Sequence, residues 1–457
     1  MNLAQVKKVY FIGIGGSGIS GLAKIFKLQG KEVIGSDLSS SEFTEDLEKE
    51  GVKIIIGQKV ENLPKDADLY VYSDAVPLEN PERKKIRELN LQDKELSYFE
   101  AMAEMMKGYE YGIAVSGTHG KTTTTAMLAL VFMQAGLDPT FIVGTKIKQI
   151  NSNAHLGQSK KYFIAEACEH REHMMKLAPN IIILTNIEED HLDYYRDLEH
   201  IQMTFQNYIN KLPAHGILVK NNDDSESREL GFDGKTVTYG IKNKAQIIAR
   251  NIRKEKKLQK FTVGKTTFTL QIPGDFNIYN ALSAIALAKE LELKDEAIQG
   301  ALKNFTGTRR RFEEVGTFKG AVVISDYAHH PTAVDSTIKA AKEFYPDRRI
   351  VMLFQPHQHN RTKKLFDGFT KCFRHADLII IQEIFDVAGR EKTEDQNISS
   401  KDLVKVVERM GKYVFYSNSL EKAKQLLHEH VEKNDVVIIA GAGDIYKVAE
   451  AICSPQK

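Results

Sequence analysis

The chain alternates short runs of β-branched residues with longer segments in which apolar residues recur at helical spacing. Strands that are apolar along their whole length and lead into amphipathic helices are typical of parallel sheets covered by helices. The pattern therefore predicts an α/β fold with mainly parallel sheets flanked by helices. A first series of strands is predicted at residues 8–15, 31–37, 52–57 and 67–73, with a helix over 17–30.

Two further series of strands follow, and a stretch between them has a different pattern. The second series is predicted at residues 111–117, 140–145, 161–167, 180–187 and 216–222. Residues 235–274 alternate apolar and polar residues around a basic turn, so we expect a small antiparallel sheet appended to this second unit. A helix is predicted over 277–293, and the third series begins after residues 305–316.

A length of 457 residues exceeds what one hydrophobic core usually serves, so several domains are expected. The three series of strands predict three domains, at residues 1–107, 108–307 and 308–457. The small antiparallel sheet is expected to belong to the second of these domains.

Composition and charge narrow the functional classes. The 63 basic and 61 acidic residues give a net charge of +2, which argues against a protein that coats nucleic acid. No apolar run reaches the ~18–20 residues that span a bilayer, and the N-terminus lacks a signal-peptide pattern. The cysteines Cys168, Cys372 and Cys453 are scattered, which disfavours a disulfide framework. We expect a cytoplasmic protein without nucleic-acid or membrane partners.

The sequence Gly-Ile-Gly-Gly-Ser-Gly lies between the first predicted strand and the first predicted helix. Its residues Gly13, Gly15 and Gly18 fit the G-x-G-x-x-G pattern, in which a glycine turn and a helix N-terminus bind a pyrophosphate. Asp37 ends the next strand, where an acid would accept a ribose hydroxyl. The pattern favours a ligand with a nucleoside diphosphate. It leaves open an NAD-dependent oxidoreductase, or a tight turn without any ligand.

A second glycine-containing turn, Ser-Gly-Thr-His-Gly-Lys-Thr, follows the strand at 111–117. It does not match the common phosphate loop, because Val115 stands where the first glycine of that pattern should be. Backbone amides at a helix N-terminus can still bind phosphates, Lys121 can neutralise them, and the hydroxyl of Thr122 can bind Mg²⁺. The alternative is a threonine-rich helix cap. The combination of Gly-Lys-Thr with a strand-to-helix turn favours the phosphate site.

Two polar segments follow neighbouring strands of the same predicted sheet. Glu166 ends one strand, and a run of acids with His191 follows another. Ligands in open α/β sheets collect at the carboxyl ends of strands, and a carboxylate is a natural Mg²⁺ ligand. A histidine is a less usual ligand for Mg²⁺, so spacing alone leaves His191 open between a structural role and a metal-binding one. His170 and His173 lack the H-E-x-x-H order, which disfavours zinc there.

Eight motifs occur in a fixed order along the chain: FIGIGGSGISGLA, SGTHGKTTTTAMLA, EACE, TNIEEDHLDYY, PGDFNIYNALSA, GTRRRFE, DYAHHPTAV and LFQPHQHNRT. In order and spacing they resemble the Mur ligase family, and the resemblance covers essentially the whole chain. The family fold implies a Rossmann-like N-terminal domain that binds a UDP-linked substrate and a central domain of the phosphate-loop ATPase type. It also implies a Rossmann-like C-terminal domain that binds an amino acid. The resemblance also implies an ATP-dependent ligase that joins L-alanine to UDP-N-acetylmuramate in peptidoglycan precursor synthesis. The reaction would pass through an acyl phosphate and release ADP and phosphate.

The resemblance further implies roles for individual residues. The ATP site would comprise Gly117, Thr118, His119, Gly120, Lys121, Thr122, Thr123, Asn277, Asn280, Arg310 and Asp326. The UDP-sugar site would comprise Gly13, Gly15, Gly16, Ser17, Gly18 and Asp37. The amino-acid site would comprise Tyr327, His329, His357 and Arg361. The groups that serve catalysis would be Lys121, Glu166, His191 and His329.

Two Mg²⁺ ions are implied as cofactors beside ATP. Thr122 and Glu166 would hold one ion, and Glu166 with His191 the other. The chain departs from the family pattern at two places: Phe276 replaces a histidine before Asn277, and Gln358 replaces a common arginine. These departures concern adenine binding and the binding of the amino-acid carboxylate, respectively.

Two alternatives remain at this point. One is a recycling ligase of the same family that attaches a preformed peptide to the same sugar, and it would share the N-terminal glycines. The other is an NAD-dependent oxidoreductase built on those glycines, which leaves the second loop and its acids without a role. The expected partners are small molecules, and the expected state is a monomer or weak homodimer.

Overall fold

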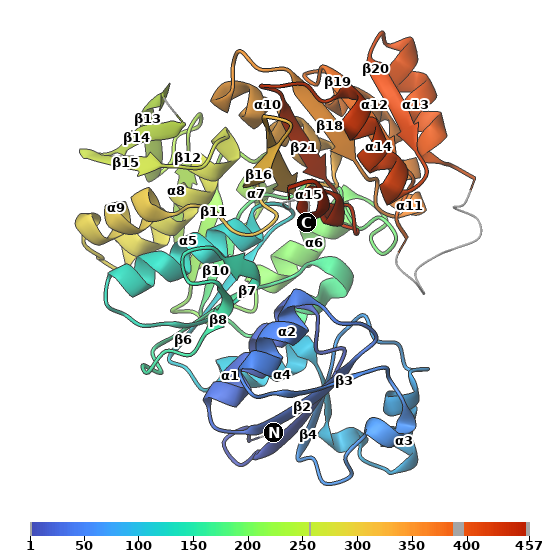
Figure 1. Ribbon diagram of the computed structural model, residues 1–457. Helices are drawn as coiled ribbons and strands as arrows, with labels where there is room; N and C mark the ends of the chain where they lie inside the picture. Colours follow the sequence, from blue (N-terminus) through green and yellow to red (C-terminus); the bar gives the residue numbers. More distant parts are fainter. Residues whose placement is uncertain (1, 256, 387–396, 454–457) are drawn as a thin grey trace.

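The computed structural model describes residues 2–255, 257–386 and 397–453, and these residues form three sheets that follow one another along the chain (Figure 1). Most neighbouring strands in each sheet are parallel, and helices flank the sheets. The predicted α/β fold with mainly parallel sheets is therefore confirmed. The long apolar runs of the sequence become buried central strands, because a parallel sheet covered on both faces leaves little strand surface for polar side chains.

The first sheet has five parallel strands in the order β3-β2-β1-β4-β5 among the described residues. Its elements are β1 (Lys8–Ile12), α1 (Ser17–Leu28), β2 (Glu32–Asp37), α2 (Glu42–Lys49), β3 (Lys53–Ile56), β4 (Leu69–Tyr72), α3 (Pro81–Glu88), β5 (Glu95–Ser97) and α4 (Tyr98–Met106). The strand order reverses between β1 and β4. The loops after these two strands meet at the carboxyl edge, which is where parallel sheets bind ligands.

The central sheet has ten strands in the order β15-β14-β13-β12-β11-β10-β6-β9-β7-β8 within the described ranges. They are β6 (Tyr111–Ser116), β7 (Thr140–Ile147), β8 (Ser152–His155), β9 (Tyr162–Glu166), β10 (Ile181–Leu184), β11 (Ile217–Asn221), β12 (Lys235–Gly240), β13 (Ile247–Glu255), β14 (Leu258–Val263) and β15 (Thr266–Leu270). Its helices are α5 (Lys121–Gln134), η3 (His170–Lys176), α6 (Leu198–Ile209), α7 (Ser225–Glu229), α8 (Asp275–Glu290) and α9 (Asp295–Asn304).

The expected separate antiparallel sheet is corrected by this topology. Strand β12 pairs in parallel with β11, and β13 continues the same sheet through a parallel pairing with β12. Antiparallel pairing begins only between β13, β14 and β15. The alternating pattern of β12 misled the prediction because this strand lies towards the end of the parallel region. There its side chains are only partly covered, as the burial of alternate residues shows.

The third sheet has six strands in the order β16-β17-β21-β18-β19-β20 over the part of the chain described. Its elements are β16 (Glu313–Phe318), β17 (Ala321–Asp326), α10 (Pro331–Phe344), β18 (Ile350–Phe354), α11 (His359–Lys364), α12 (Phe366–Cys372), β19 (Leu378–Gln382), α13 (Ser400–Arg409), β20 (Tyr413–Ser417), α14 (Leu420–His430), β21 (Val436–Ala440) and α15 (Tyr446–Cys453). Strand β16 is an antiparallel edge strand that sequence analysis missed, because two glutamates and an irregularity before Gly316 obscure its pattern.

The first two sheets share a hydrophobic core, whereas the third has its own. One cluster of buried side chains runs from β1 and α1 into the central sheet and includes Phe26, Ile142 and Ala154. The clusters around the third sheet, as far as the structure describes them, consist of residues beyond 311. The third domain is thus joined to the others mainly through polar contacts.

Among the described helices, none is long and apolar enough to cross a membrane.

Candidate active site

The loop between β6 and α5 is shaped by two glycines that other residues could not replace. Gly117 has φ +126°, and a Cβ atom there would lie 2.2 Å from Oγ1 of Thr185. Gly120 has φ +86°, and a Cβ atom there would lie 2.3 Å from Oδ1 of Asn280. The loop leads directly into α5, which begins at Lys121. Backbone N–H groups and the positive end of the helix dipole therefore meet at one place, as an anion site requires.

Lys121 folds back over this loop. Its ammonium group donates to the carbonyl oxygens of Gly117, at 2.5 Å, and Thr118, at 3.0 Å. It also forms an ion pair with Glu169, with Nζ 2.8 Å from Oε2. Burial alone would lower the pKa of Lys121, but the acidic groups around it, led by Glu169 and including Glu166, together outweigh burial and raise the pKa. The group therefore stays charged at the point where phosphates would bind.

Thr122 and Glu166 form a pair of oxygen donors beside the loop. The hydroxyl of Thr122 donates to Oε2 of Glu166 over 3.0 Å, and the backbone N–H of Gly144 donates to Oε1. Burial raises the pKa of Glu166 despite the hydrogen bond from Gly144. A buried carboxylate beside a hydroxyl is a donor set that suits a hard cation, because Mg²⁺ prefers oxygen ligands. These two residues fit the Mg²⁺ site that was expected of them.

His191 has a different carboxylate neighbour from the one expected. Its Nε2 lies 3.7 Å from Oε1 of Glu169 and 4.0 Å from Oδ2 of Asp190, and its ring stacks on that of His170. Burial lowers the pKa of His191 to about 4, so the ring is neutral near pH 7 and can act as a ligand. Glu169 was missed in the sequence, although it stands in the EACE motif three residues after Glu166. The pairing of Glu166 with His191 stays a prediction.

Asn277 and Asn280 lie beneath the loop from the side of α8. The amide of Asn280 donates to Oδ1 of Asn277 over 3.1 Å, and its Oδ1 accepts from the hydroxyl of Thr124 over 3.3 Å. Asn277 in turn donates to the carbonyl of Pro273 over 2.7 Å. Asn280 therefore lies against the phosphate loop at Gly120, and Asn277 accepts from its amide. Their expected contact with adenine stays a prediction.

The three consecutive arginines after Thr308 point to different places. Arg310 donates to the carbonyl oxygens of Gly441, at 2.8 Å, and Gly443, at 3.1 Å, so it ties the start of the third domain to the loop after β21. The guanidinium of Arg311 reaches towards the central domain instead, with Nη2 3.5 Å from Oγ1 of Thr122. Sequence analysis assigned the phosphate-facing role to Arg310. The structure places Arg311 nearer to Thr122 and Glu166, and a run of three arginines carries no signal that separates them.

The loop after β17 contributes Asp326, Tyr327 and His329. Asp326 accepts two backbone hydrogen bonds of 2.7 Å, from Phe312 and Ala328, and its burial raises its pKa. His329 Nδ1 lies 2.9 Å from the carbonyl oxygen of Tyr327. Burial, reinforced by the charge of Arg361, holds the pKa of His329 well below its ordinary value. The ring is therefore neutral.

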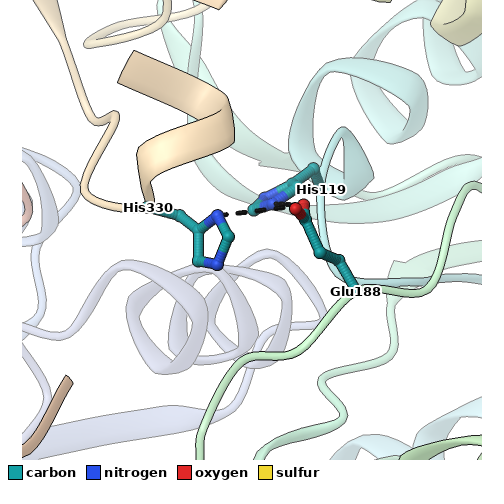
Figure 2. Close-up of side chains that lie close together, drawn as sticks. All are labelled: His119, Glu188 and His330. Atoms are coloured by element: carbon teal, nitrogen blue, oxygen red, sulfur yellow. Dashed lines mark hydrogen bonds and ion pairs between the residues drawn. The ribbon is translucent and has the colours of Figure 1, made fainter. Parts of the chain in front are cut away.

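The segment after β10 joins the central domain to the third domain. Glu188 accepts from Nε2 of His119 over 3.0 Å (Figure 2). Its other oxygen accepts from the hydroxyl of Thr332. Burial alone would raise the pKa of Glu188, but its contacts with His119, His330 and Thr332 together lower it. The ring of His330 reaches across from the N-terminus of α10, with Nε2 3.0 Å from the carbonyl oxygen of Glu189.

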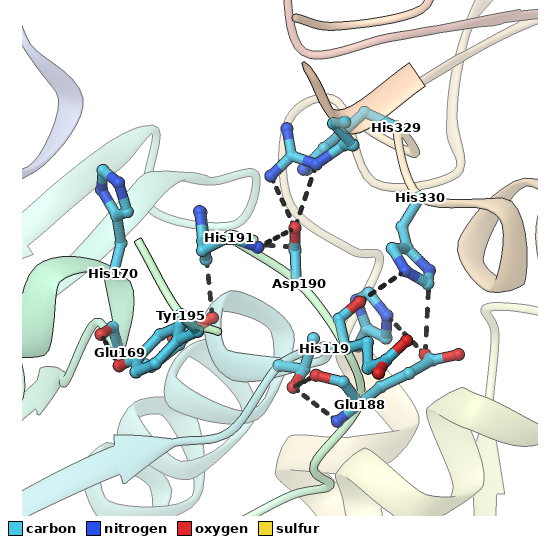
Figure 3. A network of polar contacts seen from close by, with 12 residues as sticks. His119, Glu169, His170, Glu188, Asp190, His191, Tyr195, His329 and His330 are labelled. Carbon is cyan, nitrogen blue, oxygen red and sulfur yellow. Dashed lines mark hydrogen bonds and ion pairs between the residues drawn. The ribbon is translucent and has the colours of Figure 1, made fainter. Parts of the chain in front are cut away.

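An ion pair buried between the same two domains lies next to these contacts. Nε and Nη2 of Arg361 lie 3.0 Å and 2.7 Å from Oδ1 of Asp190. Burial would raise the pKa of Asp190, but the charges of His191 and Arg361 hold it well below its usual range. Nη1 of Arg361 also lies 3.2 Å from Nδ1 of His357. The network in Figure 3 thus brings the phosphate loop, the acidic segment and the His329 loop together.

Sequence analysis treated Asp190 and Glu188 only as part of an acidic run and did not assign His330 a role. Arg361 was expected to bind an amino acid, and in the structure its nearest carboxylate is Asp190. Nothing in the spacing of these residues indicates the pairing, because Arg361 and Asp190 are 171 positions apart. The run of acidic residues that contains Glu188 and Asp190 was the one sequence feature that pointed to this region.

The N-terminal glycine turn is closely packed by its own domain. A Cβ atom at Gly15 would lie 2.9 Å from Oδ2 of Asp37, and one at Gly18 would lie 2.8 Å from Oη of Tyr98. Asp37 also accepts from the backbone N–H of Gly15 over 2.7 Å. Gly16 caps the N-terminus of α1, which begins at Ser17. The helix N-terminus therefore lies at the switch point of the first sheet. Asp37 thus braces the turn, and its expected contact with a ribose stays a prediction.

Three family models match successive parts of the chain. They are the Mur ligase family catalytic domain over residues 8–110, the Mur ligase middle domain over 115–288 and the Mur ligase glutamate ligase domain over 310–443. A UDP-N-acetylmuramate–L-alanine ligase of Alkaliphilus metalliredigens is 41% identical over the whole of this chain and 99% of its own length. The chain belongs to the Mur ligase family. This membership decides against the oxidoreductase alternative.

Solved structures of other Mur ligases share the fold. A UDP-N-acetylmuramate–alanine ligase from Thermotoga maritima is 28% identical, with a TM-score of 0.81 over 97% of this chain and 98% of that one. A murein peptide ligase from Psychrobacter arcticus is 24% identical, with a TM-score of 0.72 over 97% of this chain. At that identity the second likeness shows the fold alone.

Proposed function

We propose that this Mur ligase uses ATP to join the amine of L-alanine to the carboxyl group of UDP-N-acetylmuramate, as a step in peptidoglycan precursor synthesis. The observation that carries the proposal is the group formed by Lys121, Thr122 and Glu166 at a phosphate loop. Relatives named for this reaction, such as that of Alkaliphilus metalliredigens, match the chain from end to end. A ligase reaction needs all three parts: the phosphate loop for ATP, the N-terminal glycine turn for the UDP group, and the third domain for the amino acid.

The chemistry follows from the poor reactivity of a carboxylate. Hydroxide or oxide would have to leave if an amine attacked it directly. Transfer of the γ-phosphoryl group from ATP to one carboxylate oxygen makes an acyl phosphate, and phosphate is a far better leaving group. ADP is the other product of this first step. The neutral amine of alanine then attacks the carbonyl carbon and loses a proton, and the tetrahedral intermediate collapses to the amide by expelling phosphate.

The central domain would stabilise the phosphoryl transfer. In this role Lys121 leaves its present carbonyl partners and balances the charge of the γ-phosphate. Thr122 and Glu166 would hold Mg²⁺, and Glu169 with His191 are the groups beside them that suit a second ion. Bound Mg²⁺ supplies charge neutralisation between the two anionic reactants. Arg311 adds a fixed positive charge from the third domain.

The third domain would bring the amino acid and exclude water. His329 is neutral at pH 7 because burial holds its pKa low, so its ring can position the free amine or take up the proton that the amine loses as it attacks the carbonyl carbon. Tyr327, His357 and Arg361 lie around it and would bind the alanine. Closure of this domain over the phosphate loop would keep water from hydrolysing the acyl phosphate.

The first domain would bind the UDP group at the switch point of its sheet. The N-terminus of α1, with Gly13, Gly15, Gly16, Ser17 and Gly18, offers backbone donors for a diphosphate. Asp37 would act by bracing the turn. We also propose that the protein works in the cytoplasm as a monomer or weak homodimer, which sedimentation at several concentrations would test.

A phosphate-release assay tests the proposal. Purified protein is given ATP, Mg²⁺ and UDP-N-acetylmuramate with L-alanine, glycine, L-serine or a murein tripeptide. Phosphate release is expected to be fastest with L-alanine, and an amide product is expected by mass spectrometry. Lys121→Ala is expected to lower kcat by roughly 100-fold or more, because it removes a charge aimed at the transferred group. Lys107→Ala, which breaks only an exposed pair with Glu104, should not.

Each outcome of this assay is informative. Phosphate release that requires the tripeptide and not alanine would support the recycling ligase. Absence of phosphate release with every amine would overturn the proposal, provided that the protein is folded by circular dichroism. Equal decreases of kcat in Lys121→Ala and Lys107→Ala would contradict the assignment of Lys121 to the phosphate site.

A further inference from the structure

Two histidines and a glutamate converge where the phosphate loop meets the third domain. They are His119 of the loop before α5, Glu188 of the segment after β10 and His330 at the N-terminus of α10 (Figure 2). Oε2 of Glu188 lies 3.0 Å from Nε2 of His119 and 3.8 Å from Nδ1 of His330. One nitrogen from each ring and this oxygen all lie within 4.8 Å of one another. The Thr122 and Glu166 pair is not part of this cluster.

The spacing and the donor types match those of a transition-metal site. Ligands of a tetrahedral Zn²⁺, bound at about 2.0–2.1 Å, lie roughly 3.3 Å from one another. The two distances measured here, 3.0 Å and 3.8 Å, lie on either side of that value. Two imidazoles with one carboxylate form a typical three-residue zinc site, in which a fourth position is left to an exchangeable ligand. Mg²⁺ would prefer an all-oxygen set.

The surrounding contacts orient two of the three donors, and a metal would replace the hydrogen bond between Nε2 of His119 and Glu188. Nε2 of His330 donates to the carbonyl oxygen of Glu189 over 3.0 Å, which leaves Nδ1 without a proton. A long hydrogen bond of 3.4 Å from Thr332 N–H to this Nδ1 agrees with that tautomer. The hydroxyl of Thr332 donates to Oε1 of Glu188, so the other oxygen faces the rings. Partners that fix the tautomer and the carboxylate in this way are typical of metal sites.

We propose that His119, Glu188 and His330 form a binding site for a divalent transition metal, with Zn²⁺ as the best fit, that fastens the third domain to the central domain. His119 and Glu188 belong to the central domain, and His330 belongs to the third. A metal bound by all three therefore holds the two domains in the arrangement seen here. It takes over the lone pair of His330 that now accepts the long hydrogen bond from Thr332.

The site has a consequence for turnover that rests on the proposed ligase function. His119 belongs to the phosphate loop, and product release requires the third domain to move away. Micromolar Zn²⁺ should therefore inhibit the reaction, and a chelator should restore it. The binding test below does not need turnover, so a failed ligase assay and a failed metal site would be told apart.

The first test measures Co²⁺ and Zn²⁺ binding to the full chain. Co²⁺ serves as the probe, because it adopts the same geometry and gives a visible absorption spectrum that colourless Zn²⁺ removes on displacement. His330→Asn is the main variant, since asparagine keeps the helix cap that His330 provides but removes the imidazole. Glu188→Gln is the second variant. His155→Gln, which alters a separate histidine–aspartate pair, is the matched control.

The expected result is one tightly bound Co²⁺ per chain in the wild-type protein and the His155 control. His330→Asn and Glu188→Gln should each weaken binding by at least tenfold, in the range known for lost ligands and their supports. His170→Gln tests the other cluster, which joins His170, His191 and Asp193. Unchanged affinity in His330→Asn and Glu188→Gln, or a loss confined to His170→Gln, would overturn the proposal.

A second test asks whether the metal bridges the domains. Hydrogen exchange is followed in α10 and in residues 186–192, with and without Zn²⁺. Protection of both segments is expected in the wild-type protein and should be absent from His330→Asn. Protection of residues 186–192 alone, and equally in both proteins, would show a metal bound to the central domain only. That outcome would contradict the bridging role.

Discussion

The central domain meets its two neighbours through interfaces of different character. Towards the first domain, helix α1 packs on β7 and β8, and a Cβ atom at Gly21 would lie 3.0 Å from the side chain of Ile142. The contact belongs to one continuous apolar core, with ion pairs such as Lys176–Glu100 beside it. Towards the third domain, the contacts described above are hydrogen bonds and ion pairs made by Thr122 and residues 188–190. The first interface therefore buries apolar surface, whereas the second consists of polar contacts that water can replace at modest cost.

This difference indicates where the molecule can open. Separating the first two domains would expose apolar surface, at about 25 cal/mol for each Å². Separating the third domain would release charged groups that water solvates well, with the buried Asp190–Arg361 pair as the main exception. We therefore expect substrate entry and product release through movement of the third domain, with the first and central domains moving as one body.

The largest effect is expected from the buried ion pair. Asp190→Asn leaves the guanidinium of Arg361 without its carboxylate, and breaking a buried pair typically costs about 3–5 kcal/mol. Because the domains can open to solvate Arg361, the cost should appear as lost closure, seen as a fall of roughly 100-fold in kcat/KM and a larger radius of gyration. Glu343→Gln is the control, since it breaks an exposed pair with Lys254 that is worth under about 1 kcal/mol. Equal effects of the two variants would contradict the comparison.

A smaller effect is expected at the apolar interface. Gly21→Leu forces extra atoms between α1 and β7, and such overpacking typically costs about 1–3 kcal/mol. The melting temperature should fall while the third domain closes normally. Gly300→Leu tests a helical glycine in α9 with more room, since the nearest atoms to its Cβ position are 3.8 Å away. If the Gly300 variant were destabilised as much, the interface would not be the cause.

Acidic pH should open the polar interface and spare the apolar one. Burial lowers the pKa of His330 in the closed form, whereas in the open form it should return towards about 6.5. The open form then binds more protons below pH 6.5, so closure weakens as the pH falls. At pH 5.5, protonation of this histidine should weaken the free energy of domain closure by up to about 1.4 kcal/mol. Small-angle scattering at pH 7.5 and 5.5 checks it, and His330→Asn should reduce the change.

The smallest effect is expected from salt. Exposed pairs such as Lys254–Glu343 and Lys257–Glu314 join the central and third domains, and salt screens such pairs. Raising the ionic strength from about 0.05 M to about 0.5 M should weaken closure by less than about 1 kcal/mol. The radius of gyration should rise slightly, and the melting of the first two domains should stay unchanged. A salt response confined to the first domain would reverse the comparison.

The sequence predicted what depends on local pattern. Strands that are apolar throughout identified the parallel sheets, and Gly117 and Gly120 identified a loop whose backbone tolerates no side chain. The sequence did not distinguish the role of Arg310 from that of Arg311, and it did not identify Glu169 as a neighbour of His191. The directions in which adjacent side chains point are set by how the domains pack, which the sequence pattern does not show. The Asp190–Arg361 pair also escaped prediction. Contacts between domains join residues that are far apart in the sequence, and the spacing of apolar residues does not predict such contacts.

The central claim is that ATP activates the sugar carboxylate before the amine attacks. It is tested most directly with UDP-N-acetylmuramate labelled with oxygen-18 in both carboxylate oxygens, incubated with ATP, Mg²⁺, L-alanine and the purified protein. One labelled oxygen should leave with the phosphate, because that oxygen receives the γ-phosphoryl group and departs when the amide forms. Mass spectrometry of the released phosphate should therefore find one oxygen-18 in each molecule. Unlabelled phosphate alongside amide product would contradict the acyl-phosphate route, and phosphate without any amide product would contradict ligation itself.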